Sequence, residues 1–184
     1  EVRERGVTCV FLLPGGTGSV GGLGAVLRLD EARSVLQKEA ALCLAVPGGE
    51  TSGPARRHDA VLQLRRLFES GRQYAETWAK YRKDLAEFTE KKKTPEPGKG
   101  EAKAVEPVKP KRDVRLERVA RTLDPQAPLP VRVEVHAEDA LRGVLKLAEE
   151  FKLRLVIEGG TEGGPLAALF AKAGVPVLAA PALR

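Results

Sequence analysis

Methionine is absent from this sequence of 184 residues, and only two cysteines, two histidines and one tryptophan are present. Because an initiator methionine is also missing, we expect the natural N-terminus to lie outside this sequence or to be processed away. Cys9 and Cys43 lie in apolar stretches without metal-ligand spacing, and a disulfide between them is the alternative to free thiols. Both are predicted to be buried free thiols, which fits a reducing compartment.

Long apolar runs are also missing. No stretch of about 18 apolar residues is present, which excludes a transmembrane helix, and we predict no membrane partner. The first five residues, Glu1–Arg5, include four charged side chains and lead directly into a strand-like run, unlike a secretory signal peptide. Cytoplasm is therefore the favoured compartment, although the sequence leaves the compartment open.

An excess of positive charge is confined to one segment. The formal net charge is +6, and the segment from Lys80 to Arg121 contains 14 Lys or Arg and 8 Asp or Glu. The rest of the chain has 17 of each. No aromatic-interleaved motif accompanies the basic segment, so we predict no nucleic-acid partner. No pattern indicates the oligomeric state.

The residues that are present indicate a globular α/β chain, with 42% apolar and 30% charged residues. Its most regular part contains three predicted strands, 131–136, 153–158 and 175–179, whose starts are 22 residues apart. Apolar residues at helical spacing fill both gaps. Such short connections through helices require parallel neighbouring strands in that order. A doubly wound sheet and a closed barrel both fit this pattern.

The N-terminal region is predicted to contain two strands and a helix. The strand-like runs are Val7–Leu13 and Ala25–Leu29, separated by a glycine-rich loop, and the helix covers Asp30–Leu44. The helix is predicted because Leu36, Ala40 and Leu44 recur every four residues.

The middle region, about 54–128, is predicted to be a helical insertion. Apolar residues from Val61 to Phe88 follow helical spacing, and five of the eight aromatic residues lie on that face. Gly71 weakens the centre and is predicted to break the helix in two. The segment Lys91–Lys111 is rich in lysine, proline and glycine, so it is predicted to be a flexible loop without regular structure.

Two strand ends carry candidate functional residues. His136 ends the first regular strand, on the same face as Arg132 and Glu134, and Glu158 ends the next. Catalytic groups collect at the carboxyl ends of parallel strands, so a metal site is one hypothesis for both residues. The alternatives are a histidine bonded to the backbone, and a loop in which Thr161 caps the next helix and Glu162 favours its positive end.

Other motifs are weaker. The residues Gly16–Gly21 match a dinucleotide-binding glycine pattern, but that pattern requires a helix to begin near Gly21, where a strand-like run follows. A tightly turned loop is the default interpretation, and no nucleotide cofactor is predicted. His58 lies at a polar helix start and is predicted to have a surface role.

Five stretches resemble the imidazolonepropionase-like branch of the amidohydrolase superfamily. The first four are Gly6–Thr8, the glycine-rich Pro14–Leu27, LQKEAALCLAV at Leu36–Val46 and YAETWAKYRKD at Tyr74–Asp84. The most specific is LPVRVEVHAEDALRGVLKLAEEFKLRLVIEGGTEG, from Leu129 to Gly163. The resemblance implies that residues 1–184 are a segment of a (β/α)8 TIM-type barrel. It also implies a divalent metal, zinc by preference, and a small-molecule substrate with a non-peptide C–N bond that is hydrolysed.

The resemblance implies that His136 is a metal ligand, with Glu158 as a weaker candidate. The sequence departs from the family where Glu-His-Gly-Thr is usual, because it reads Glu158-Gly159-Gly160-Thr161. Cys43 replaces a frequent lysine, and the family's His-x-His pair and its aspartate base would lie before Glu1 and after Arg184. We therefore expect an amidohydrolase-like protein with a degenerate metal site and no assigned catalytic residue. The alternative is a non-catalytic barrel homologue that acts as a binding or structural module.

Overall fold

The computed structural model describes residues 3–14, 20–30, 32, 34–48, 52–93 and 106–179. In chain order the elements are η1 (Arg3–Arg5), β1 (Cys9–Leu12), β2 (Val20–Arg28), β3 (Val35–Ala45), α1 (Pro54–Lys93), α2 (Val114–Thr122), β4 (Val131–Val135), α3 (Glu138–Phe151), β5 (Leu155–Gly159), η2 (Gly164–Leu166), α4 (Ala167–Ala173) and β6 (Val177–Leu178). Within these ranges, no helix combines the length and the hydrophobicity needed to cross a bilayer.

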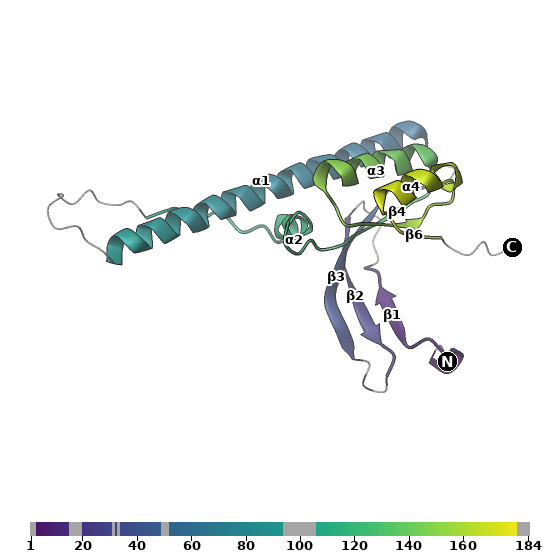
Figure 1. Ribbon diagram of the computed structural model, residues 1–184, viewed down its shortest axis with the longest axis horizontal. Helices are drawn as coiled ribbons and strands as arrows, with labels where there is room; N and C mark the ends of the chain where they lie inside the picture. Colours follow the sequence, from purple (N-terminus) through teal and green to yellow (C-terminus); the bar gives the residue numbers. More distant parts are fainter. Residues whose placement is uncertain are drawn as a thin grey trace.

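The six strands form one sheet in the order β1-β2-β3-β4-β5-β6. β1, β2 and β3 pair antiparallel, whereas β3, β4, β5 and β6 pair parallel. The predicted parallel order of the last three strands is therefore confirmed. The helices lie beside the parallel half, and the antiparallel half extends away from them (Figure 1). Closure of such strands into a (β/α)8 barrel, and the domain bounds, remain predictions.

The helix predicted over Asp30–Leu44 is wrong, because most of that segment is strand β3. A spacing of four residues is an even number, so it fits the alternation of a strand as well as the turn of a helix. Ser34 donates both its backbone N–H (2.9 Å) and its hydroxyl (2.8 Å) to the Asp30 carboxylate, which holds the turn before β3. Leu42 and Leu44 then face the core.

The glycines after residue 20 lie in strand β2 rather than in a loop. Because a strand and not a helix runs through Gly21, the nucleotide-binding alternative is wrong; residues 15–19 lie outside the described part of the chain. Gly24 has a packing role in this strand. A Cβ at this position would lie 2.3 Å from Cζ of Phe11, so the missing side chain lets the Phe11 ring lie across β2.

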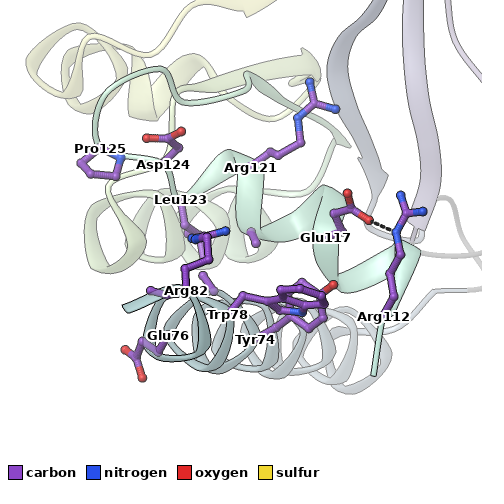
Figure 2. Close-up of a pocket in the computed structure, with 13 residues that line it drawn as sticks. Tyr74, Glu76, Trp78, Arg82, Arg112, Glu117, Arg121, Leu123, Asp124 and Pro125 are labelled. Atoms are coloured by element: carbon purple, nitrogen blue, oxygen red, sulfur yellow. Dashed lines mark hydrogen bonds and ion pairs between the residues drawn. The ribbon is translucent and has the colours of Figure 1, made fainter. Parts of the chain in front are cut away.

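Helix α1 is continuous over 40 residues, so the predicted break at Gly71 is wrong. Instead, Gly71 allows α2 to approach, because a Cβ there would lie 2.5 Å from Cγ1 of Val119. Beyond this crossing, Tyr74 and Trp78 lie beside α2, with their ring centroids 6.0 Å apart (Figure 2).

The structure describes only part of the predicted flexible loop, Lys91–Lys111. Residues 91–93 belong to α1, so that part of the prediction is wrong, because the helix continues through the lysine run. Residues 94–105 lie outside the described residues. Residues 106–111 have no helix or strand, as predicted.

The core lies between the parallel strands and the helices. Val131, Val133 and Val135 of β4 are buried, and they join a cluster that includes Phe68 of α1 and Leu141 of α3. This burial on one face sends the intervening side chains of β4 to the other face. Cys43 is buried as predicted, but Cys9 is exposed because it begins the edge strand β1.

Candidate functional site at the strand ends

His136 follows directly after β4, where the chain leaves the sheet. Its side chain is 37% exposed and opens on a cavity of about 540 Å³. The cavity is lined by Ala45, Val46, Pro47, Gly48, Glu134, His136, Thr161 and Glu162. These residues come from the ends of three parallel strands, β3, β4 and β5, and from the loops after them. His58, which is exposed on α1, is not among them.

The His136 ring is held by two polar neighbours. Its Nδ1 is hydrogen bonded to Oγ1 of Thr161 at 2.8 Å, and its Nε2 lies 3.6 Å from Oε1 of Glu134. The backbone also joins the two loops, because the Glu162 N–H donates to the His136 carbonyl at 2.9 Å. The alternative of a histidine bonded only to the backbone is therefore wrong, since the ring itself bonds a side chain.

Two glycines leave room for the His136 ring. A Cβ at Gly159 would lie 2.4 Å from Cε1 of His136, and a Cβ at Gly48 would lie 3.3 Å from Cδ2. Gly159 also has a φ of +90°, which favours glycine over other residues. Gly159 stands at the position where the family that the sequence resembles has a second histidine. Here Gly159 leaves room for the ring of His136.

Glu158 is bound to a guanidinium rather than free for a metal. Arg132 forms an ion pair with it, and the two side chains are 16% and 15% exposed. The Arg132 guanidinium carbon also lies 4.0 Å from the centroid of the Phe11 ring. Burial lowers the pKa of Arg132 from its ordinary value, yet an arginine stays charged at the pH of cells.

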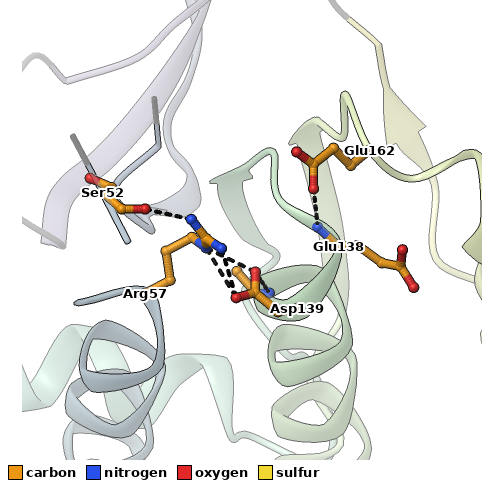
Figure 3. A network of polar contacts seen from close by, with 6 residues as sticks. Ser52, Arg57, Glu138, Asp139 and Glu162 are labelled. Carbon is orange, nitrogen blue, oxygen red and sulfur yellow. Dashed lines mark hydrogen bonds and ion pairs between the residues drawn. The ribbon is translucent and has the colours of Figure 1, made fainter. Parts of the chain in front are cut away.

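One alternative predicted that Thr161 caps the following helix and that Glu162 favours its positive end. Both side chains instead bond residues at the end of β4 and the start of α3. Thr161 bonds His136, and Oε2 of Glu162 accepts the backbone N–H of Glu138 at 2.9 Å. The carboxylate therefore stabilises the start of α3, the helix behind β4, because helix N-termini have free N–H groups. This contact depends on tertiary structure, because the loop after β5, which contains Glu162, lies beside the start of α3 (Figure 3).

A second ion pair beside this loop was not predicted. Arg57 of α1 donates through Nε and Nη2 to the Asp139 carboxylate of α3, each at 2.9 Å, and through Nη1 to the Ser52 carbonyl (Figure 3). The hydrogen bonds from Arg57 lower the pKa of Asp139. The two residues are 82 positions apart, so no local pattern indicates the pair.

The residues present do not fit a bound metal ion. Among the described residues, no group of three or more His, Cys, Asp or Glu side chains is placed to hold one. Glu158 is paired with Arg132, so the described residues leave His136 and Glu134, an imidazole and a carboxylate, without a third protein ligand. Catalytic zinc sites use three protein ligands.

Comparisons with known proteins give one informative likeness. No protein-family profile and no curated protein sequence matches the chain. Among solved structures, the chain is similar to the crystal structure of an amidohydrolase from Thermotoga maritima, with a TM-score of 0.72 and 24% sequence identity. The match covers 96% of this chain but 43% of that protein, so the chain spans less than half of its structural neighbour. At this identity the likeness shows that the two share a fold over the matched region.

Proposed function

We propose that this chain is a segment of a divergent amidohydrolase-superfamily protein, of the imidazolonepropionase-like branch, and that its metal site is degenerate. Two observations support the ancestry. The fold matches part of an amidohydrolase, and the stretch Leu129–Gly163, which carries the most specific resemblance, folds as β4, α3 and β5 around His136. The protein is in this view derived from hydrolases that act on non-peptide C–N bonds of small molecules.

The ion pair between Arg132 and Glu158 carries the proposal that the site is degenerate. A divalent cation at Glu158 would have to displace a guanidinium that is five-sixths buried, and would leave two like charges close together. Arg132 thus supplies the positive charge that a metal would otherwise bring to this carboxylate. We infer that this chain binds its small-molecule ligand at the strand ends without hydrolysing it.

A second candidate is an intact hydrolase completed by residues that this chain does not include. The orientation of His136 favours it, because Thr161 bonds Nδ1 while Nε2 faces the Glu134 carboxylate at 3.6 Å. Metal-ligating histidines commonly bond a neighbour through the nitrogen that does not hold the metal. The remaining ligands and the proton acceptor would come from a longer protein, as the 43% coverage of the neighbour allows.

The test is metal content and turnover of the purified chain after incubation with zinc or manganese. We expect less than one bound metal per chain and no hydrolysis of a lactam, a hydantoin or an N-acyl amino acid. Arg132→Met frees Glu158 and should raise zinc uptake, whereas the control Arg142→Met, which removes an exposed helix ion pair, should not. Tight one-to-one metal with turnover that His136→Ala abolishes would support the second candidate instead.

A further inference from the structure

A second cavity lies away from the strand ends, between the distal half of α1 and α2 with the turn that follows it (Figure 2). Its volume is about 670 Å³, and none of the residues lining it lines the cavity beside His136. Small-molecule sites typically enclose about 300–1,000 Å³, so this cleft has the size of such a site. Tyr74 and Trp78 lie on the α1 side, and Leu123 and Pro125 lie on the other side.

Two aromatic side chains of α1, Tyr74 and Trp78, line the cleft, and Tyr81 packs against Trp78. Trp78 packs between Tyr74 and Tyr81, with ring centroids 6.0 Å and 5.9 Å away, and it meets Tyr81 edge to face. All three side chains are half-buried. Rings locked in this way offer a flat apolar face to a planar ligand without a large loss of side-chain entropy.

One cation in the cleft is available to a ligand. Arg112 is paired with Glu117 at 2.8 Å, and Arg121 is paired with Glu39 of β3. By contrast, Arg82 makes no ion pair within the described part of the chain, and its side chain rises from α1 towards Leu123 (Figure 2).

The acidic residues that line the cleft compete little for this cation. Glu117 is bound to Arg112, and Oδ1 of Asp124 accepts the backbone N–H of Gln126 at 2.9 Å. Glu76 points away from the cleft (Figure 2). The cleft therefore combines an aromatic face with a guanidinium that has no ion-pair partner among the described residues. Such a guanidinium is a donor fork that matches a carboxylate.

We propose that this cleft binds a small planar aromatic carboxylate, with its ring against Trp78 and its carboxylate on the Arg82 guanidinium. The aromatic face provides apolar contact, and the charge-assisted hydrogen bonds provide orientation and select an anion. The proposal is independent of the function proposed for the strand ends, since the two sites share no lining residue.

Trp78 is the sole tryptophan, so its indole N–H gives a single reporter signal from the cleft in a ¹H–¹⁵N NMR spectrum. The probe is 4-fluorobenzoate, compared with the neutral 4-fluorobenzyl alcohol and the cationic 4-fluorobenzylamine. We expect saturable shifts of the indole signal and of the ligand ¹⁹F signal with the anion alone. Arg82→Gln should weaken binding about tenfold, since hydrogen bonds between charged groups are the strong ones.

Two further variants test whether the cleft prefers a negatively charged ligand. Asp124→Asn should tighten binding of the anion, because it removes a nearby negative charge. Arg118→Gln, an exposed change on the same helix α2, should leave binding unchanged. The proposal is overturned if the indole signal shows no saturable shift with 4-fluorobenzoate at concentrations up to about 10 mM, because a site with millimolar affinity would be largely occupied there. Equal responses to the three probes, or equal losses in Arg82→Gln and Arg118→Gln, would also overturn it.

Discussion

His136 and Thr161 are joined across two neighbouring parallel strands, with Nδ1 of the ring 2.8 Å from the threonine hydroxyl oxygen. Each residue lies just beyond the end of its strand, β4 or β5, so the hydrogen bond connects the two loops that line the candidate site. The bond orients the ring and leaves Nε2 on the side of Glu134. Thr161 is thus a positioning residue for His136.

Replacing Thr161 with valine should release the His136 ring. Valine keeps the shape but removes the hydroxyl, so Nδ1 of the ring loses the hydrogen-bond partner that holds its orientation. Long-range ¹⁵N NMR of the ring nitrogens should show a changed Nδ1 chemical shift for His136. The chain has two histidines, and the exposed His58 on α1 serves as the internal control. Unaltered ring nitrogen shifts for His136 would show that the hydroxyl does not orient it.

Gly159→Ala should destabilise the fold by about 1–3 kcal/mol, the range for a strained backbone position. The backbone φ is +90°, and the new methyl carbon would lie 2.4 Å from Cε1 of His136. Urea unfolding measures the change, and Gly53→Ala is the matched control, because a Cβ at Gly53 meets nothing within 4 Å. Equal stability of the two variants would contradict this account. The same geometry predicts that Gly159→His does not recreate a metal site.

The parallel part of the fold could be predicted because its signals are local. Alternation in 131–135 and an amphipathic helix behind it specify strand, face and direction within a short window. The same reasoning failed for β3, where apolar residues four positions apart fit a strand and a helix equally. The helix break at Gly71 failed because the glycine is required by a contact with Val119, a residue 48 positions later.

The candidate site was predictable only in part, for a related reason. His136 could be found because a strand end is recognisable from sequence, and parallel strands gather their ends. Its partner Thr161, the Arg132–Glu158 pair and the Arg57–Asp139 pair depend on register and helix packing between separate segments. No spacing rule connects residues 25, 26 and 82 positions apart. In the sequence, Gly159 indicated only that a histidine ligand is missing. The structure was needed to show that Gly159 leaves room for the His136 ring.

Gly71→Ala should destabilise the chain by up to about 2 kcal/mol, because overpacking a core costs about 1–3 kcal/mol and the gain in helix propensity offsets about 1 kcal/mol of it. The overpacking arises because the added methyl would lie 2.5 Å from Cγ1 of Val119. Val119→Ala removes the opposing methyl groups, so the double variant should be more stable than the sum of the single changes allows. A double-mutant cycle by urea unfolding measures this, and strict additivity would contradict direct contact.

The two cysteines should differ in alkylation rate. Cys9 is exposed, whereas burial raises the pKa of the Cys43 thiol, so Cys43 has less of the reactive thiolate at neutral pH. Iodoacetamide followed by peptide mass spectrometry should show that Cys9 is labelled first in the folded chain. In urea the two rates should converge. Faster labelling of Cys43 in the folded chain would contradict its buried position.

The Arg57–Asp139 pair should make stability depend on pH in the acid range. Hydrogen bonds from Arg57 lower the pKa of Asp139 in the folded chain, below the value of about 3.9 for an unfolded aspartate. The contribution of the pair is therefore complete above about pH 4 and is lost as the pH falls through the lower folded-state pKa.

The measurement is a double-mutant cycle with Arg57→Gln and Asp139→Asn, followed by urea unfolding at several pH values. We expect the coupling free energy to be constant from about pH 5 to pH 7 and to decrease below about pH 4, because protonated Asp139 no longer attracts the guanidinium. A coupling that persists unchanged to about pH 2 would mean that the contact between α1 and α3 depends on packing rather than on the carboxylate charge.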